Sequence, residues 1–477
     1  MQNALKLKEF VQHYLIIFLF LELALGLSAI VLPINIVLIL LLGLPAILIL
    51  LLRPFYAYIL GVILLPVWDI TWTGAQQIPE AVDFRFADIL FIVGVLGLML
   101  KVALDKDFQF AGSNIDFPLL LLFTWMAVSL SWTFDLSAGI IDFIKKIYGL
   151  ILFYLTVNLV RNKRNLDIVL KVWILTGIIW SIAAIIELVS MGLPQAVGLI
   201  EKHGIISHWG ERVRSSAFAE TPNKLGTILS FSLLIAFAQY AISQKRWSKI
   251  ILFVAILVML LALISTMSRT TWAAFFLISI LLFIWVKNIR KLTFALGIVA
   301  ILILFAILTT DYREVIFQRV AGIISPVQTP DFIPRLNVYI VGLRMFQDRP
   351  LNGVGIGSFH LLALSYGSIE LDAPHNIFIY MLSEFGIIGF GLFLFLIIRF
   401  IVSMRENIKK TLGNVKIILY SLSAAMAFYI IQSMIISARL RETSMWALLG
   451  LAMAAIRIFG SDPLLNSEQS RSKADGT

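Results

Sequence analysis

The sequence contains no cysteine among its 477 residues. Disulfide bonds, thiolate zinc sites and a cysteine nucleophile are therefore excluded. Charged residues make up only 14% of the chain, against about a quarter in a typical soluble domain. Acidic residues form no cluster with the spacing of a metal site, so neither a metal nor another cofactor is expected.

Apolar residues dominate what is present. They account for 60% of the chain, and the mean hydropathy is +0.95. They occur in long runs separated by short basic clusters, which is typical of helical spans and not of the alternating strands of outer-membrane barrels. We therefore expect an all-α, polytopic transmembrane helical bundle of about 12–14 spans with a large extracytoplasmic loop. Because the first apolar run is followed by another, and not by a cleavage site, we interpret it as a retained anchor.

The basic residues predict the topology. The net charge of +10 comes from small clusters between spans, such as Arg161, Lys163 and Arg164, and no basic domain could follow a nucleic-acid backbone. These clusters predict cytoplasmic N- and C-termini and exclude a nucleic-acid partner. The predicted spans include residues 15–32, 86–104, 144–160, 294–308 and 377–398, with a polar outer loop at 310–374.

Four regions follow from this topology. Residues 1–210 form N-terminal transmembrane helices, and residues 211–401 form a membrane core that includes the outer loop 310–374. Residues 402–460 form a C-terminal transmembrane hairpin, and residues 461–477 form a cytoplasmic tail.

A histidine lies at the boundary between the outer loop and the next span, in the stretch Pro374-His375-Asn376. An unperturbed imidazole titrates near pH 6.5, so a histidine at a membrane interface can take or hold a proton at neutral pH. The alternative is a histidine that caps the following helix and hydrogen-bonds its loop.

Several arginines fall on the predicted outer side, where positive charge is otherwise depleted. Their planar guanidinium groups suit bidentate contacts with phosphate, and several together can hold a lipid diphosphate at the membrane surface. The alternative is contact with lipid headgroups or acidic partners. These arginines are Arg212, Arg214, Arg269, Arg335, Arg344, Arg349, Arg439 and Arg441.

Four stretches together resemble the O-antigen ligase and polymerase superfamily of polytopic bacterial glycosyltransferases. They share one predicted side of the membrane and cover about residues 211–389. The stretches are Arg212-Val213-Arg214-Ser215-Ser216-Ala217-Phe218 with Pro222-Asn223; Ser268-Arg269-Thr270; Arg335 with Arg349-Pro350-Leu351-Asn352-Gly353-Val354-Gly355; and Pro374-His375-Asn376 with Glu384-Phe385-Gly386-Ile387-Ile388-Gly389.

The resemblance implies a metal-independent, inverting transfer of a glycan from a polyprenyl (undecaprenyl) diphosphate to a saccharide, lipid or protein acceptor. The location it implies is the outer face of the bacterial cytoplasmic (inner) membrane. On this reading His375 is catalytic, either as the base for the acceptor hydroxyl or as a hydrogen-bond donor to the reacting phosphate. Arg214 and Arg269 bind the diphosphate. The family has one arginine before its Phe and Pro-Asn elements, and Arg212 is a second candidate, beside Arg214, for that position.

Further residues are assigned supporting parts in the site: Arg335, Arg349, Asn376 and Glu384. An intramembrane glutamate usually has a polar partner, although Glu384 beside Gly386 equally suits close helix packing. Lys146 begins a predicted span, where contact with headgroups is expected. Three glycines at 353, 355 and 357 are not followed by the residues of a nucleotide-binding loop.

Two classes of function remain open from the sequence. The enzyme class includes a ligase, which transfers a finished polysaccharide, and a polymerase, which extends a chain by repeat units. The other class is a transporter or flippase for a lipid-linked saccharide. Outer arginines and the absence of paired broken helices in two halves favour the enzyme.

Overall fold

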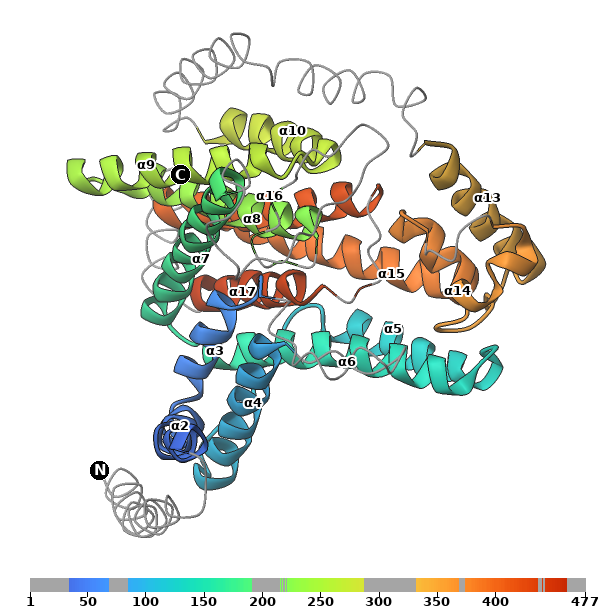
Figure 1. The fold of residues 1–477 in the computed structure, drawn as a ribbon, viewed down its shortest axis with the longest axis horizontal. Coiled ribbons are helices and arrows are strands. Elements are labelled where there is room, and N and C mark those ends of the chain that lie inside the picture. The colour runs from blue at the N-terminus through green and yellow to red at the C-terminus, as the bar shows by residue number, and fades with distance from the viewer. Residues whose placement is uncertain are drawn as a thin grey trace, which may run out of the picture. The chain divides into compact units, whose positions relative to one another are not determined.

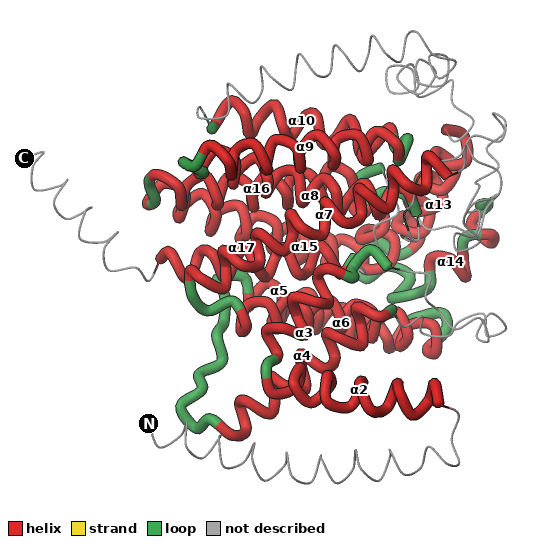
Figure 2. The backbone as a smooth tube through the Cα atoms, turned by 60° about the vertical axis from the view of Figure 1, so that its left-hand side comes forward, coloured by secondary structure: helices red, strands yellow, loops and turns green. Residues whose placement is uncertain are grey.

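The computed structural model describes residues 34–67, 85–190, 221–286, 332–368, 374–435 and 442–460, with the single residues Ser215, Ala217, Ala219 and Leu440. Every regular element within these ranges is a helix (Figures 1 and 2). Seven of the described helices are long and apolar enough to cross a membrane. The expected polytopic helical bundle is thus confirmed, and the chain is a multi-pass membrane protein. The predicted spans 15–32 and 294–308 lie outside the described residues.

The chain forms two compact units. Unit 1 comprises residues 1–61 and 86–111, and its described helices are α2 (Ile34–Leu52), most of α3 (Pro54–Ile63) and α4 (Phe86–Leu104). The axes of α2 and α3 differ by 113° across Arg53. Pro54 explains the bend, because a proline disfavours helical backbone at the residue before it. Helix α4 has the predicted bounds.

Unit 2 comprises residues 62–85 and 112–477 and holds the remaining described helices. Helices α17 and α8 are its two most enclosed spans, and the backbone carbonyls and hydroxyls of α8 make contacts with α7 and α16. Ser232 donates to the carbonyl of Trp173 (2.7 Å), and Ser421 donates to the carbonyl of Leu234 (2.9 Å). The helices are α5 (Asp116–Val128), α6 (Leu136–Leu159), α7 (Lys163–Ser190), α8 (Pro222–Ile242), α9 (Arg246–Ser265), α10 (Arg269–Trp285), α13 (Phe332–Asp348), α14 (Phe359–Leu362), α15 (Ile377–Lys410), α16 (Gly413–Ser433) and α17 (Thr443–Gly460).

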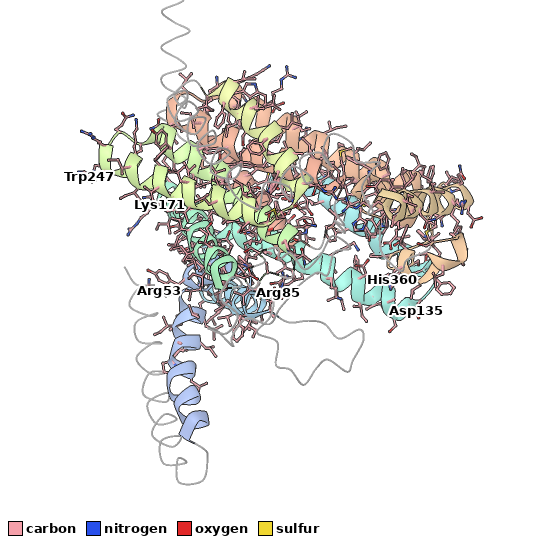
Figure 3. All side chains as sticks on the ribbon, turned by 45° about the horizontal axis from the view of Figure 1, so that its top comes forward. Arg53, Arg85, Asp135, Lys171, Trp247 and His360 are labelled. Carbon is pink, nitrogen blue, oxygen red and sulfur yellow. The ribbon has the colours of Figure 1, made fainter. Side chains whose placement is uncertain are left out.

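The helix termini of unit 2 gather in two groups. We call one group the histidine end. It holds the C-terminal ends of α5, α7, α9 and α16 and the N-terminal ends of α6, α8, α10, α15 and α17 (Figure 2). The other group is called the basic end. Figure 3 labels Asp135 and His360 toward the histidine end, and Lys171 and Trp247 toward the basic end. Exposed basic residues of the basic end include Arg161, Lys163, Arg164, Lys171, Lys245, Arg246, Arg405, Lys409 and Lys410.

Part of the predicted outer loop is itself folded. Helix α13 packs on α14 and on the chain between them, around a small core of its own. This part is called segment 332–368. The residues of its core are Val338, Val341, Met345, Val354, Phe359 and Ala363.

Helix α6 begins earlier than the predicted residue 144. Asp135 precedes its first turn, and its carboxylate accepts a hydrogen bond from the Ala138 N–H (2.9 Å), which starts the helix at Leu136. The predicted boundary lies too late in the chain because Lys146 was expected to contact headgroups at the start of the span. In the fold Lys146 pairs with Asp142 inside the helix bundle.

Candidate active site

His375 directly precedes α15 and is half-buried. The cap of that helix is Asn376, whose side-chain oxygen accepts hydrogen bonds from the N–H groups of Phe378 (2.9 Å) and Ile379 (3.2 Å). The alternative reading of His375 as the helix cap is therefore wrong. The backbone of His375 is held separately, because its carbonyl accepts a hydrogen bond from the Tyr339 hydroxyl (3.0 Å).

Tyr339 joins three elements at the histidine end. Its hydroxyl, which belongs to α13, reaches the carbonyl of His375 and also the carbonyl of Met434, just after α16 (3.4 Å). Burial raises the pKa of the Tyr339 phenol above its ordinary value of 10.0, and the nearby positive charge of Arg335 offsets part of this shift. The phenol is therefore protonated at neutral pH and acts as a donor. Arg335 lies one helical turn before Tyr339, so both are on one face of α13.

A second polar network surrounds the turn that precedes Arg269. Ser268 donates to the side chain of Asn223 at the start of α8 (2.7 Å), and its oxygen is 2.7 Å from that of Thr271. Thr271 accepts a hydrogen bond from Gln432, near the end of α16 (2.8 Å). Arg269 is the first residue of α10 and is half-buried. Two of the sequence stretches, around Asn223 and around Arg269, thus come together in the fold.

Arg212 and Arg214 lie outside the described residues, as do Arg439 and Arg441. Ser215, which follows Arg214 in the chain, is described: its N–H donates to the carbonyl of Ser265 at the end of α9 (3.2 Å). Its hydroxyl donates to the carbonyl of Ala184 in α7 (2.7 Å). Ser265 is separated from Arg269 only by a short turn, so Ser215 reaches the same turn region.

The arginines of segment 332–368 have different surroundings. Arg344 donates to the carbonyl of Tyr366 (3.0 Å), so it contributes to the fold of the segment. Arg349 follows α13 and is exposed, whereas Arg335 is half-buried beside Tyr339. Arg335 is therefore next to Tyr339, the residue that contacts the backbone of His375.

Helix α15 is broken at Gly386, which has φ 63° and ψ −167°. The backbone groups freed by the break are satisfied by chain from outside the helix. The carbonyls of Ser383 and Glu384 accept hydrogen bonds from the N–H groups of Val354 and Gly355 (2.9 Å each). The indole of Trp125 in α5 donates to the carbonyl of Phe385 (3.0 Å). Sequence reasoning missed this break, because the apolar run continues through it.

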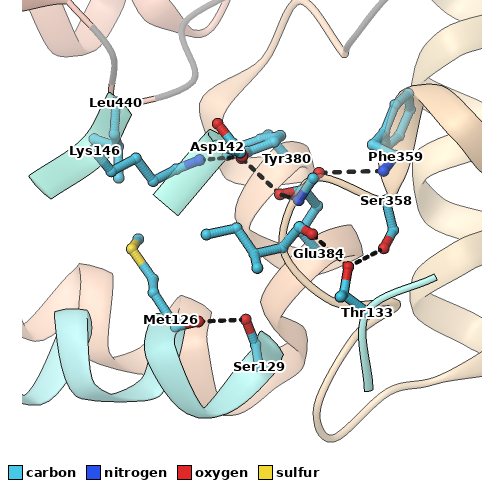
Figure 4. A network of polar contacts seen from close by, with 12 residues as sticks. Met126, Ser129, Thr133, Asp142, Lys146, Ser358, Phe359, Tyr380, Glu384 and Leu440 are labelled. Carbon is cyan, nitrogen blue, oxygen red and sulfur yellow. Dashed lines mark hydrogen bonds and ion pairs between the residues drawn. The ribbon is translucent and has the colours of Figure 1, made fainter. Parts of the chain in front are cut away.

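Glu384 is buried and accepts three hydrogen bonds (Figure 4). They come from the Tyr380 hydroxyl (2.6 Å) and from the N–H groups of Gly357 (3.1 Å) and Phe359 (3.2 Å). The first of the two readings, a glutamate with polar partners, therefore describes this residue. Close packing also occurs, but at Gly386, where a Cβ atom would overlap the carbonyl of Leu351.

Lys146 does not contact lipid headgroups as predicted. Its side chain is fully buried and forms an ion pair with Asp142, one turn earlier in α6. The ammonium lies 5.4 Å from the centre of the Tyr380 ring, and the Tyr380 hydroxyl is 3.3 Å from the Asp142 carboxylate. Lys146 thus belongs to the same buried network as Glu384.

The three loop glycines use their N–H groups within the fold. The N–H groups of Gly353, Gly355 and Gly357 donate to the carbonyls of Arg349 and Glu384 and to the Glu384 carboxylate, respectively. All three have positive φ, at 70°, 97° and 72°, which only glycine adopts without strain. The loop is therefore shaped to fit against α15, and not to surround a phosphate.

Comparison with known families gives one match. Residues 254–394 match the family model described as O-antigen ligase. The match supports, over this part of the chain, the predicted resemblance to the O-antigen ligase and polymerase superfamily. The matched range contains Arg269, segment 332–368, His375 and Glu384, but not Arg212 and Arg214. No curated protein matches the chain in a sequence search.

Proposed function

We propose that this protein transfers a glycan from a polyprenyl diphosphate carrier to the hydroxyl of an acceptor. The observation that carries the proposal is a line of contacts across the histidine end. Tyr339 bonds both His375 and Met434, and Gln432, two residues before Met434, bonds Thr271. Thr271 lies in the first turn of α10, which Arg269 begins. The histidine and an arginine of the family-matched region are therefore linked through the end of α16.

The arginines hold the diphosphate in this proposal. The departing diphosphate gains negative charge as the bond to the sugar breaks, and fixed guanidinium groups stabilise that charge. Arg269 supplies one such group, and Arg214 supplies another, with Arg212 as the alternative. The contact between Ser215 and Ser265 supports this pairing, since it brings the chain next to Arg214 to the end of α9.

His375 acts on the acceptor in an inverting displacement. The acceptor oxygen forms a bond to the anomeric carbon while the bond from that carbon to the diphosphate oxygen breaks, and the electron pair leaves with the diphosphate. The imidazole takes the proton of the acceptor hydroxyl. The alternative is that the imidazole donates a hydrogen bond to the reacting phosphate and the diphosphate takes the proton.

The basic end faces the cytoplasm in this proposal. Its exposed lysines and arginines fit the excess of positive charge found on cytoplasmic sides of membrane proteins. The histidine end then opens to the outer face of the bacterial cytoplasmic membrane, with both chain termini inside. Residues 211–401 form the catalytic core, which is where Arg269 and His375 lie.

Reconstitution of the purified protein with a polyprenyl diphosphate oligosaccharide tests the proposal. The oligosaccharide is offered alone and then with a saccharide, lipid or protein acceptor, and product masses are measured. Chain growth without added acceptor identifies a polymerase, whereas a single transfer to the acceptor identifies a ligase. Passage of intact donor across the bilayer without a new glycosidic bond would show a flippase and refute the proposal.

A further inference from the structure

A short helix carries His375 at its start. The break at Gly386 separates residues 377–385 from the rest of α15, so this piece is not a rigid extension of the long span. Its position depends on lateral contacts. Glu384 makes buried polar contacts with the backbone of segment 332–368, and the buried polar contact with α6 comes from Tyr380, which had no part in the sequence-based site.

Tyr380 joins the short helix to α6. Its hydroxyl donates to Glu384 on its own helix (2.6 Å) and lies 3.3 Å from the carboxylate of Asp142 on α6. The ammonium of Lys146, which pairs with Asp142, lies 5.4 Å from the centre of its ring. Its backbone N–H also donates to the carbonyl of Asn376 (2.9 Å), the residue after His375.

The residues that make these contacts are buried from solvent. Tyr380, Asp142, Lys146 and Glu384 are all buried, with exposed fractions of 1%, 2%, 0% and 2%. Polar contacts in such a site are not replaced by water when one partner is removed, so a lost hydroxyl leaves the Glu384 and Asp142 carboxylates each with one donor fewer. The Tyr380 hydroxyl is therefore suited to fix the lateral place of the short helix.

We propose that Tyr380 is a positioning residue for the transfer reaction: it anchors residues 377–385 to α6 and thereby sets the place of His375. This inference rests on the proposed function, because His375 is the group that is positioned. Tyr380 itself does not touch the substrate. Its loss acts on the catalytic step through His375 and leaves the binding of the lipid diphosphate unchanged.

Tyr380→Phe removes the hydroxyl alone, and Tyr429→Phe is the matched control. Both tyrosines are buried in unit 2, and among the described residues the Tyr429 hydroxyl has no hydrogen-bond partner. Transfer by each variant is measured as kcat and as KM for the polyprenyl diphosphate oligosaccharide. We expect Tyr380→Phe to lower kcat about tenfold or more, with KM within about twofold, because small misplacements of a reacting group slow catalysis by such factors.

A second measurement reports position without activity. The chain has no cysteine, so spin labels at Ser131→Cys and His375→Cys report one distance distribution without background. Ser131 is exposed between α5 and α6. We expect a narrow distribution in this labelled protein and with Tyr429→Phe, and a broadened or shifted one with Tyr380→Phe. Glu384→Gln, measured in both ways, should show the same directions and replaces Tyr380→Phe if that variant does not fold.

Each outcome decides the proposal. A normal kcat, a raised KM with normal kcat, an equal loss in Tyr429→Phe or an unchanged distance distribution in Tyr380→Phe would each overturn it. If the parent protein transfers no glycan, the proposed function fails, and the distance measurement still tests whether Tyr380 holds the short helix.

Discussion

The two ends of unit 2 are built differently. At the basic end, helices begin and finish among exposed lysines and arginines, and Lys171 pairs with Asp167 one turn away on the surface. At the histidine end, α15 is broken, a charged pair is buried in α6, and chain from segment 332–368 completes the hydrogen bonds of α15. The charged side chains of the first end are largely exposed, whereas specific protein partners satisfy the buried polar groups of the second.

Backbone strain follows the same division. The described non-glycine residues with positive φ are Ala217 (46°), Met267 (49°) and Leu440 (57°). Ala217 is three residues after Arg214, Met267 is two residues before Arg269, and Leu440 lies between two of the predicted outer arginines. Such strained backbone conformations persist only where surrounding contacts hold them in place, and they cluster at functional sites. Their distribution therefore supports the histidine end as the active one.

Gly386→Ala should give the largest loss of stability. A Cβ atom there would overlap the carbonyl carbon and oxygen of Leu351, and the backbone at φ 63° and ψ −167° disfavours any side chain. We expect the variant to lose stability by about 3 kcal/mol or more, from strain and from displaced hydrogen bonds. The measurement is chemical unfolding in detergent.

Gly391→Ala is the control in the same helix. Nothing lies within 4 Å of a Cβ atom at Gly391, so this change should be neutral or stabilise the protein by about 0.5–1 kcal/mol. Similar unfolding curves for the two variants would show that the break at Gly386 is not required.

Lys146→Met should give the next largest effect. It leaves the Asp142 carboxylate buried without its cation, and loss of one partner of a buried pair costs about 3 kcal/mol. Lys171→Met breaks the surface pair with Asp167, which should change stability by about 0.5 kcal/mol or less. Unfolding of the two variants under the same conditions compares the two ends directly.

The double variant Asp142→Asn/Lys146→Met sharpens this test. It removes both charges, so it should recover part of the stability that Lys146→Met loses. No recovery of stability, or equal losses for Lys146→Met and Lys171→Met, would contradict the interpretation that each charge of the buried pair is stabilised by the other.

Arg269→Ala should weaken binding of the polyprenyl diphosphate by about tenfold or more, as expected for loss of a hydrogen-bonded charge contact of about 1.5–3 kcal/mol. Arg269→Lys should restore only part of the affinity, because a lysine has no planar fork. Arg246→Ala at the basic end is the control and should leave affinity unchanged. Binding of the labelled donor is measured for all three, and equal affinities would remove Arg269 from the donor site.

Tyr339→Phe should have the smallest effect, a loss of about 1 kcal/mol or less at neutral pH from its hydrogen bonds. The raised pKa of Tyr339 means that its stabilisation is fully present below pH 10 and is lost as pH rises through the folded-state pKa. The stability difference between the parent protein and Tyr339→Phe should therefore shrink above pH 10. A difference that stays constant up to higher pH would argue against the protonated phenol as the donor.

Hydropathy predicted the spans well where the helix surface is uniform. Helix α4 has the predicted bounds, and α15 begins at the predicted residue 377. The prediction failed where polar groups are satisfied inside the protein. Asp142 and Lys146 lower the hydropathy of the first part of α6, so the span was predicted to begin later. The apolar run from Ile377 continues through Gly386, so hydropathy gave no sign of the break there.

The sequence placed the stretches around Asn223 and Arg269 on one side of the membrane, and the structure brings these two into contact. The capping of the helix by Asn376 was not predicted. Tyr339 and Tyr380 were missed, because a tyrosine in an apolar or loop sequence carries no signal of its partner. Both contacts that define them join residues distant in the chain, Tyr339 to Met434 and Tyr380 to Asp142.

Transfer by His375→Ala is the most direct test of the central claim, that the histidine end is the catalytic one. Parent protein, His375→Ala and His360→Ala are reconstituted with the polyprenyl diphosphate oligosaccharide and an acceptor, and donor affinity and turnover are both measured. We expect His375→Ala to bind donor normally and to turn over at least about a hundredfold more slowly. We expect His360→Ala to retain turnover. Full turnover by folded His375→Ala would show that the histidine is not catalytic.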